Sequence, residues 1–186
     1  MRIIGGKYRG KKLFSPQENG VRPTSDRARE SVFNILNSML PMEWSEYRLA
    51  DLFAGTGAFA LEALSRGVST ITMIDINTSI IKKNAALFPT EKEKIKIITA
   101  DAAKLGRNLQ KYNLLFMDAP YNKGLSELAL LSLSQNDWLE DGTICIVETE
   151  KKEKLPLPAG FELTDERIYG LAKISFLVYS SNLKTV

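Results

Sequence analysis

The sequence predicts an α/β fold, a doubly wound and mostly parallel sheet that follows a basic extension. Two observations carry this prediction. From residue 48 onward, apolar runs typical of strands alternate with helical segments of about ten residues, which implies right-handed crossovers between parallel strands. Near the end of the chain, residues 161–170 and 172–180 are both strand-like and meet near Gly170, so we expect an antiparallel pair there.

The beginning of the chain has a different pattern. Residues 2–14 contain short apolar stretches broken by glycines, which is typical of a small hairpin or an extended arm. Residues 15–22 are polar and loop-like. Thr24 or Ser25 can cap the helix that follows, whose apolar residues recur at helical spacing.

The remaining elements alternate regularly. Strands are predicted at residues 48–53, 69–75, 95–101, 112–118 and 142–150, and helices at 58–67, 77–88, 102–111 and 125–133. A boundary near 41–47 divides the chain into an N-terminal basic extension, residues 1–45, and a second domain, residues 46–186.

Composition excludes several kinds of chemistry. No apolar run approaches the roughly 20 residues that cross a bilayer, and the first residues lack the apolar segment of a signal peptide. We therefore expect a cytoplasmic protein without a membrane partner, and a monomer. The chain has one cysteine, Cys145, and no histidine. Internal disulfides, cysteine-cluster metal sites, serine–histidine triads and imidazole catalysis are thereby excluded, and we expect no metal.

Positive charge is concentrated at the N-terminus. Residues 1–30 hold eight Lys or Arg against three acids, whereas the rest of the chain is slightly acidic. A basic arm on an acidic body indicates a polyanionic partner held by the arm. A solvated basic terminus is the alternative.

Acidic residues stand at the ends of the predicted strands, where ligands of open parallel sheets bind. Between the first strand and its helix, "DLFAGTGAFA" matches a G-x-G-x-x-A turn. Asp51 precedes this turn, and Asp75, Asp101 and Asp118 end the next three strands. Each of them alone can merely cap the following helix. Together, they favour a cationic cofactor such as S-adenosylmethionine over NAD or ATP, and no P-loop lysine follows the turn.

The fourth strand ends in Asp118-Ala119-Pro120-Tyr121. An exocyclic amine of a nucleobase is a poor nucleophile, because its lone pair is delocalised into the ring. The Asp118 carboxylate and the Ala119 carbonyl can accept the amine hydrogens and direct the lone pair at a methyl group. Pro120 restricts the backbone at Ala119, and Tyr121 offers a face on which an unstacked base can stack. An ordinary proline turn is the alternative.

The chain resembles a known family on "DLFAGTGAFALEALSRG", "IDIN", "TAD" and "DAPY", which follow "MRIIGGKYRGKKL" and "RPTSDRARESVFNIL". These stretches are similar to the bacterial 16S ribosomal RNA guanine-N2 methyltransferases of the RsmD type. The resemblance implies a Rossmann-like class I methyltransferase fold with seven strands, the last inserted antiparallel between the fifth and the sixth. It also implies that residues 118–121 contact the target guanine. The family pattern is D-P-P-[YF], so Ala119 replaces a proline and removes some rigidity.

The same resemblance implies roles for individual residues. Those expected to bind S-adenosylmethionine are Asp51, Phe53, Ala54, Gly55, Thr56, Gly57, Asp75, Ile76, Asp101 and Ala102. Those expected to bind phosphates of ribosomal RNA, or of the assembling small subunit, are Lys7, Arg9, Lys11, Lys12, Arg22, Arg27 and Arg29.

Three other functions remain open at this point. A methyltransferase of DNA adenine N6 or of protein glutamine would use a similar tetrad. A nucleotide-binding oxidoreductase is disfavoured by Asp51 and by the lack of acid–base residues for its substrate. A non-catalytic RNA-binding relative would explain Ala119 as a first sign of decay.

Overall fold

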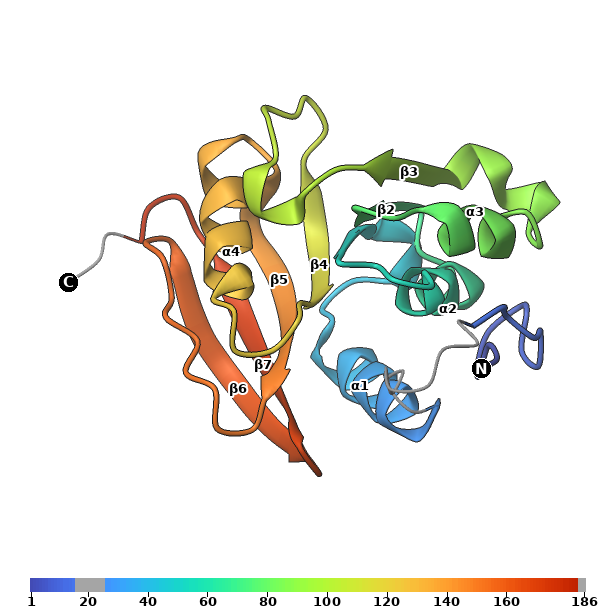
Figure 1. Cartoon of the computed structure of the whole chain (residues 1–186), viewed down its shortest axis with the longest axis horizontal. Coiled ribbons are helices and arrows are strands. Elements are labelled where there is room, and N and C mark those ends of the chain that lie inside the picture. Colours follow the sequence, from blue (N-terminus) through green and yellow to red (C-terminus); the bar gives the residue numbers. More distant parts are fainter. Residues whose placement is uncertain (16–25, 184–186) are drawn as a thin grey trace.

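The computed structural model describes residues 1–15 and 26–183 and contains one seven-stranded sheet in the order β3-β2-β1-β4-β5-β7-β6 (Figure 1). Strands β3, β2, β1, β4 and β5 are mutually parallel. Strand β7 lies between β5 and β6 and is antiparallel to both. The predicted doubly wound sheet, its antiparallel final pair and the position of the last strand are therefore confirmed.

The bounds of the elements follow the predicted alternation closely. The strands are β1 Arg48–Leu52, β2 Thr70–Asp75, β3 Ile95–Thr99, β4 Tyr112–Asp118, β5 Leu139–Glu150, β6 Phe161–Tyr169 and β7 Ala172–Tyr179. The helices are α1 Asp26–Met39, α2 Ala58–Arg66, α3 Ser79–Ala85 and α4 Leu125–Gln135, with short 3₁₀ turns η1 Trp44–Glu46, η2 Pro89–Lys94 and η3 Ala102–Lys104. No helix in the described ranges has the length and apolar character that a bilayer crossing requires.

Two hydrophobic cores cover the two faces of the sheet. One contains the apolar stripe of α1, most of α2 and Ile81 of α3, packed on alternate residues of the central strands. The other contains the inner face of α4 and Ala102 of η3, packed on the intervening residues. Strand residues alternate between the two cores because side chains of a strand point to opposite faces. Phe59 and Phe116 stack with their ring centroids 3.6 Å apart in the first core.

The register of the sheet brings the predicted strand ends to one edge. Leu52 of β1 is opposite Ile74 of β2 and Met117 of β4, so the residues that follow these three strands emerge side by side. The chain leaves β1 toward β2 and β3 and returns on the other side at β4. The turn after β1 therefore lies at the topological switch point, where ligands of open sheets bind.

The N-terminal segment forms a hairpin that is fastened to α2. An antiparallel bridge joins Arg2 to Lys12, which confirms the predicted hairpin. The buried Glu62 carboxylate accepts hydrogen bonds from the backbone N–H groups of Ile4 and Gly5, at 2.6 and 2.8 Å. Ile3 and Leu13 of this hairpin are buried in the first core, together with residues of the sheet.

The prediction of a helix at residues 102–111 is wrong. Only η3, Ala102–Lys104, is helical in this stretch. The next backbone N–H groups bond to distant partners: Leu105 donates to Ser132 Oγ at 2.9 Å, and Asn108 donates to the Asn136 carbonyl at 2.9 Å. Contacts with α4 and with Asn136, the residue after it, therefore replace the intrahelical bonds that the local composition favours.

Candidate active site

The turn after β1 has a backbone that requires glycine. Gly55 and Gly57 have φ values of 56° and 75°, in the left-handed region that side chains disfavour. A Cβ atom on Gly57 would also lie 2.6 Å from Sδ of the buried Met73. Phe53 adopts φ 56° without the freedom of glycine. A Cβ atom on Gly55 would meet only the Phe53 carbonyl oxygen, at 3.9 Å, so a ligand can approach the main chain closely at Gly55.

Asp51 is a buried acid directly beneath this turn. Its side chain is 1% exposed, and its Oδ2 accepts a hydrogen bond from the Ala60 N–H at 3.2 Å. Within the part of the chain that the structure describes, its Oδ1 has no hydrogen-bond partner. Burial, and to a lesser degree the charges of Asp118 and Asp75, raise the pKa of Asp51 well above its usual value. Such an acid is an acceptor that a cationic donor would satisfy.

Asp75 connects the end of β2 to the glycine turn. Its Oδ2 accepts from the Gly55 N–H at 2.8 Å, and its Oδ1 accepts from the Asn77 N–H at 2.9 Å. The neighbouring Ile76 is 76% exposed, which leaves an apolar surface beside the carboxylate. The end of β2 therefore offers a carboxylate and, next to it in the chain, an exposed apolar side chain.

Asp101 caps a helix, which the sequence analysis gave as the alternative to cofactor binding. Its Oδ1 accepts from the Ala103 N–H at 3.0 Å and caps η3, while Ala102 is buried in the second core. The side chain of Asp101 remains exposed. Asp51 also accepts from an N–H in the first turn of α2, so capping and ligand binding do not exclude each other at either site.

The tetrad at residues 118–121 lies on the opposite side of the switch point from Asp75. Asp118 is the last residue of β4 and is paired in register with Glu148 of β5. Ala119 is buried, whereas Pro120 and Tyr121 are exposed at the surface. The Tyr121 hydroxyl donates to Glu148 Oε1 at 2.9 Å. Burial, followed by the charges of Glu148 and Asp118, raises the pKa of Tyr121, so the hydroxyl keeps its proton and remains a donor.

Sequence reasoning did not identify the residues that hold this tyrosine. Besides Glu148, Asn122 follows it in a left-handed conformation, φ 58°, and donates through Nδ2 to Glu150 Oε2 at 2.6 Å. The sequence does show that the fifth strand, like the others, ends in acids: Glu148 and Glu150 belong to "VETE". Two side chains from β5 therefore fix the turn that carries Tyr121.

The predicted phosphate-binding residues fall into three groups: those on the hairpin, those outside the described residues, and Arg29. Lys7, Arg9 and Lys12 are exposed on the hairpin, and Lys11 is half-buried. Arg22 and the side chain of Arg27 lie outside the described residues.

The prediction for Arg29 is wrong, because its side chain is 2% exposed and its Nη2 donates to the Arg2 carbonyl at 2.6 Å. Its role is to fasten α1 to the hairpin.

A single buried side chain links the hairpin to the glycine turn. Asn84 of α3 accepts from the Phe14 N–H at 2.7 Å and donates through Nδ2 to the carbonyls of Phe14 and Thr56. Thr56 Oγ1 also lies 3.4 Å from Met1 Sδ. The basic hairpin and the predicted cofactor turn are therefore parts of one connected structure.

Comparisons with known proteins identify relatives of nearly the whole chain. The family model described as conserved hypothetical protein 95 matches residues 1–178. The ribosomal RNA small subunit methyltransferase D of Escherichia coli strain K12 is 34% identical over 96% of this chain and 89% of its own length. The protein of the same name from Haemophilus influenzae is 32% identical over 97% of this chain and 94% of its own.

Solved structures have the same fold. The Escherichia coli protein yhhF superposes with a TM-score of 0.79 at 32% identity, covering 98% of this chain and 99% of that one. TrmN from Thermus thermophilus superposes with a TM-score of 0.66 over 82% of this chain and 48% of that one, at 20% identity, which establishes likeness of fold alone.

Proposed function

The chain belongs to the RsmD family of methyltransferases, and from this premise we propose that it transfers a methyl group from S-adenosylmethionine to the exocyclic N2 amine of a guanine in small-subunit ribosomal RNA. The observation that carries the proposal is the placement of Asp118 and Tyr121 across the switch point from the glycine turn and Asp75. We further propose that residues 1–45 bind RNA and that residues 46–186 hold the cofactor and catalyse, in the cytoplasm.

The residues around the glycine turn fit S-adenosylmethionine. Oδ1 of Asp51 offers a buried acceptor for the cationic methionine end, and the open space beside Gly55 leaves room for close approach. Asp75 and the exposed Ile76 would hold the ribose and the adenine from the end of β2. The cofactor supplies a methyl group that its sulfonium has already activated.

The side chains of the tetrad position the amine that receives this methyl group. The Asp118 carboxylate and the Ala119 carbonyl accept the two amine hydrogens, which favours a pyramidal nitrogen with its lone pair directed at the methyl carbon. The exposed ring of Tyr121 stacks on the guanine, and its bond to Glu148 keeps the ring in place. As the bond from nitrogen to the methyl carbon forms, the bond from this carbon to sulfur breaks, and the surplus proton of the now cationic nitrogen passes to the Asp118 carboxylate or to water. Loss of this acidic proton needs no strong base, which agrees with a chain without histidine.

The proposal is tested by the choice of methyl acceptor. Purified protein is incubated with S-adenosylmethionine labelled in its methyl group, and with small-subunit ribosomal RNA, large-subunit ribosomal RNA, duplex DNA or a protein extract in parallel. The RNA substrates come from cells that lack the protein, both naked and as assembling particles. We expect label in the small-subunit RNA alone, and label in DNA or protein instead would contradict the proposal.

Cofactor binding is expected to depend on pH through Asp51. Burial favours the protonated, neutral Asp51, whereas a bound cation favours the carboxylate, so binding of the cofactor should release a proton. The affinity for S-adenosylmethionine should therefore rise with pH until Asp51 is ionised in the free protein. Calorimetry in buffers of different ionisation enthalpy measures the proton release, and Asp51→Asn should abolish it. An equal pH dependence in Asp51→Asn would contradict this role.

Tyr121 is expected to act through its ring more than through its hydroxyl. Stacking of a base on an aromatic ring contributes about 1–3 kcal/mol, so Tyr121→Ala should raise the KM for RNA by roughly tenfold to a hundredfold. Tyr121→Phe keeps the ring and loses only the bond to Glu148, so its KM should rise only slightly. Steady-state assays at saturating cofactor measure both values. If the two variants were impaired equally, the ring would not be the contact.

A further inference from the structure

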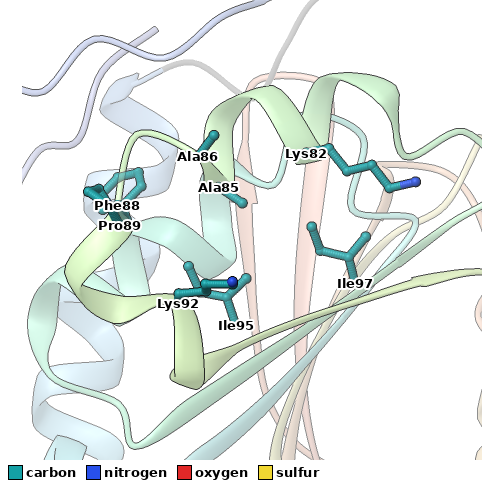
Figure 2. Close-up of a pocket in the computed structure, with 8 residues that line it drawn as sticks. All are labelled: Lys82, Ala85, Ala86, Phe88, Pro89, Lys92, Ile95 and Ile97. Carbon is teal, nitrogen blue, oxygen red and sulfur yellow. The ribbon is translucent and has the colours of Figure 1, made fainter.

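A cavity lies on the flank of the sheet, between α3, η2 and the edge strand β3 (Figure 2). Its volume of about 460 Å³ is within the range of pockets that hold small ligands. The floor is apolar, and Figure 2 shows Lys82 above Ile97 and Lys92 close to Ile95. The other lining residues are Ala85, Ala86, Phe88 and Pro89. Ile95 and Ile97 lie before the strand end that carries Asp101, so this cavity is separate from the site described above.

The charge around this cavity differs from that of the rest of the chain. Residues 1–15 and 82–96 together contain ten Lys or Arg and two Glu, so these segments carry a charge of +8. The whole chain has a charge of +3, so all other residues together are at −5. Among the residues that the structure describes, no acid lines the cavity. A surface of this composition attracts a polyanion.

The two basic segments pack against each other at one wall of the cavity. The rings of Tyr8 and Phe88 meet edge to face with centroids 5.0 Å apart, and Lys11 Nζ donates to the Leu87 carbonyl at 2.8 Å. Phe88 is therefore shared between the hairpin and the cavity. Lys11 Nζ also lies 5.1 Å from the centroid of the Phe88 ring, so a basic side chain of the hairpin adjoins a wall of the cavity.

Glu91, which lies between the lining residues Pro89 and Lys92 in the chain, does not cancel this charge. Glu91 is held between Lys7 at 2.7 Å and Lys94 at 3.0 Å, and it also accepts from the Tyr8 hydroxyl at 2.7 Å. Hydrogen bonds from Lys7, Tyr8 and Lys94 lower the pKa of Glu91 to about 2. Its charge is neutralised within this cluster, and the exposed Lys82 and Lys92 remain available at the rim.

We propose that this cavity binds one unstacked base of a single-stranded RNA segment, with the adjoining phosphates on Lys82 and Lys92. The inference rests on the proposed function, because it assigns a second contact for the same RNA. A nucleotide combines a flat, largely apolar face with an anionic phosphate, and the cavity combines an apolar floor with two cations. The hairpin would hold the neighbouring phosphates on Arg9 and Lys12.

Methyl NMR tests the proposal without relying on catalysis. A short single-stranded RNA of mixed sequence is titrated into the full chain while the methyl signals of Ala85, Ala86, Ile95 and Ile97 are followed. We expect these signals to shift together. Ala86→Trp, which fills the cavity from an exposed position, should weaken binding of this RNA about tenfold. If RNA bound without shifting these signals, the proposal would be overturned.

Charge variants give an independent readout. Lys82→Ala and Lys92→Ala should each lower the slope of log affinity against log salt by about 0.7. Lys111→Ala, an exposed lysine just before β4, is the matched control and should not change the slope. Equal slopes in all three variants, or methyl shifts with an acidic peptide but not with RNA, would overturn the proposal. If methyl shifts with RNA occurred in a protein that methylates no RNA, the proposed function would fail and this subsite would stand.

Discussion

Replacement of Asp118 by asparagine is expected to lower turnover about a hundredfold to a thousandfold, with little change in the affinity for S-adenosylmethionine. The carboxylate offers acceptors to the amine of the target base, whereas an amide of the same size presents N–H groups on one side. Asp118 ends β4 and lies across the switch point from Asp75 and the glycine turn, so the change should not disturb the cofactor.

Single-turnover assays with labelled cofactor measure the methyl-transfer step, and calorimetry measures binding of the cofactor. Glu127→Gln is the matched control, because Glu127 is an acid in the first turn of α4, shortly after the tetrad in the chain, and has no proposed contact with the base or with Tyr121. Its turnover should stay within a few-fold of the parent. Parent-like turnover in Asp118→Asn would remove Asp118 from the mechanism.

Replacement of Glu62 by alanine is expected to have the largest effect on folding. The Glu62 carboxylate is fully buried and accepts from the backbone N–H groups of Ile4 and Gly5, and from Arg66 Nε at 2.9 Å. Its removal leaves two amides and a largely buried guanidinium without this partner, which costs about 3–5 kcal/mol of the free energy of unfolding. Chemical denaturation measures this loss.

A second readout separates release of the hairpin from general instability. Limited proteolysis of Glu62→Ala should cut within residues 1–15 under conditions in which the rest of the chain stays folded. Glu162→Ala, at an exposed position of β6, is the control and should change the free energy of unfolding by no more than about 0.5 kcal/mol. Equal stability of the two variants would show that Glu62 does not fasten the hairpin.

The sheet and its ligand edge could be predicted from the sequence because their signals are local. Each strand is a short apolar run, and an acid or a glycine turn follows it, so the order of strands determines which acids share an edge. Residues 102–111 show the limit of such reasoning. Their composition favours a helix, but Ser132 and Asn136 of a later segment take their backbone N–H groups.

The burial of individual side chains could not be predicted from the sequence either. Arg29 counts as one more positive charge in the sequence, yet it is buried beneath the hairpin and donates to the Arg2 carbonyl. Glu148 was missed because its partner lies far away in the chain. An acid in a buried strand gives no sign of its partner, and the partner, Tyr121, lies 27 positions earlier in the chain. Pairings of this range depend on the register between β4 and β5.

The central claim is the identity of the methylated atom, and nucleoside mass spectrometry of the RNA product tests it most directly. Small-subunit RNA from cells that lack the protein is treated with the purified parent or with Asp118→Asn, and the digested nucleosides are compared with synthetic standards. We expect one new N2-methylguanosine per RNA with the parent and, in the same short reaction time, at most about a hundredth of that product with the variant. A methyl group on another base or another atom of guanine, or equal product from Asp118→Asn, would contradict the account.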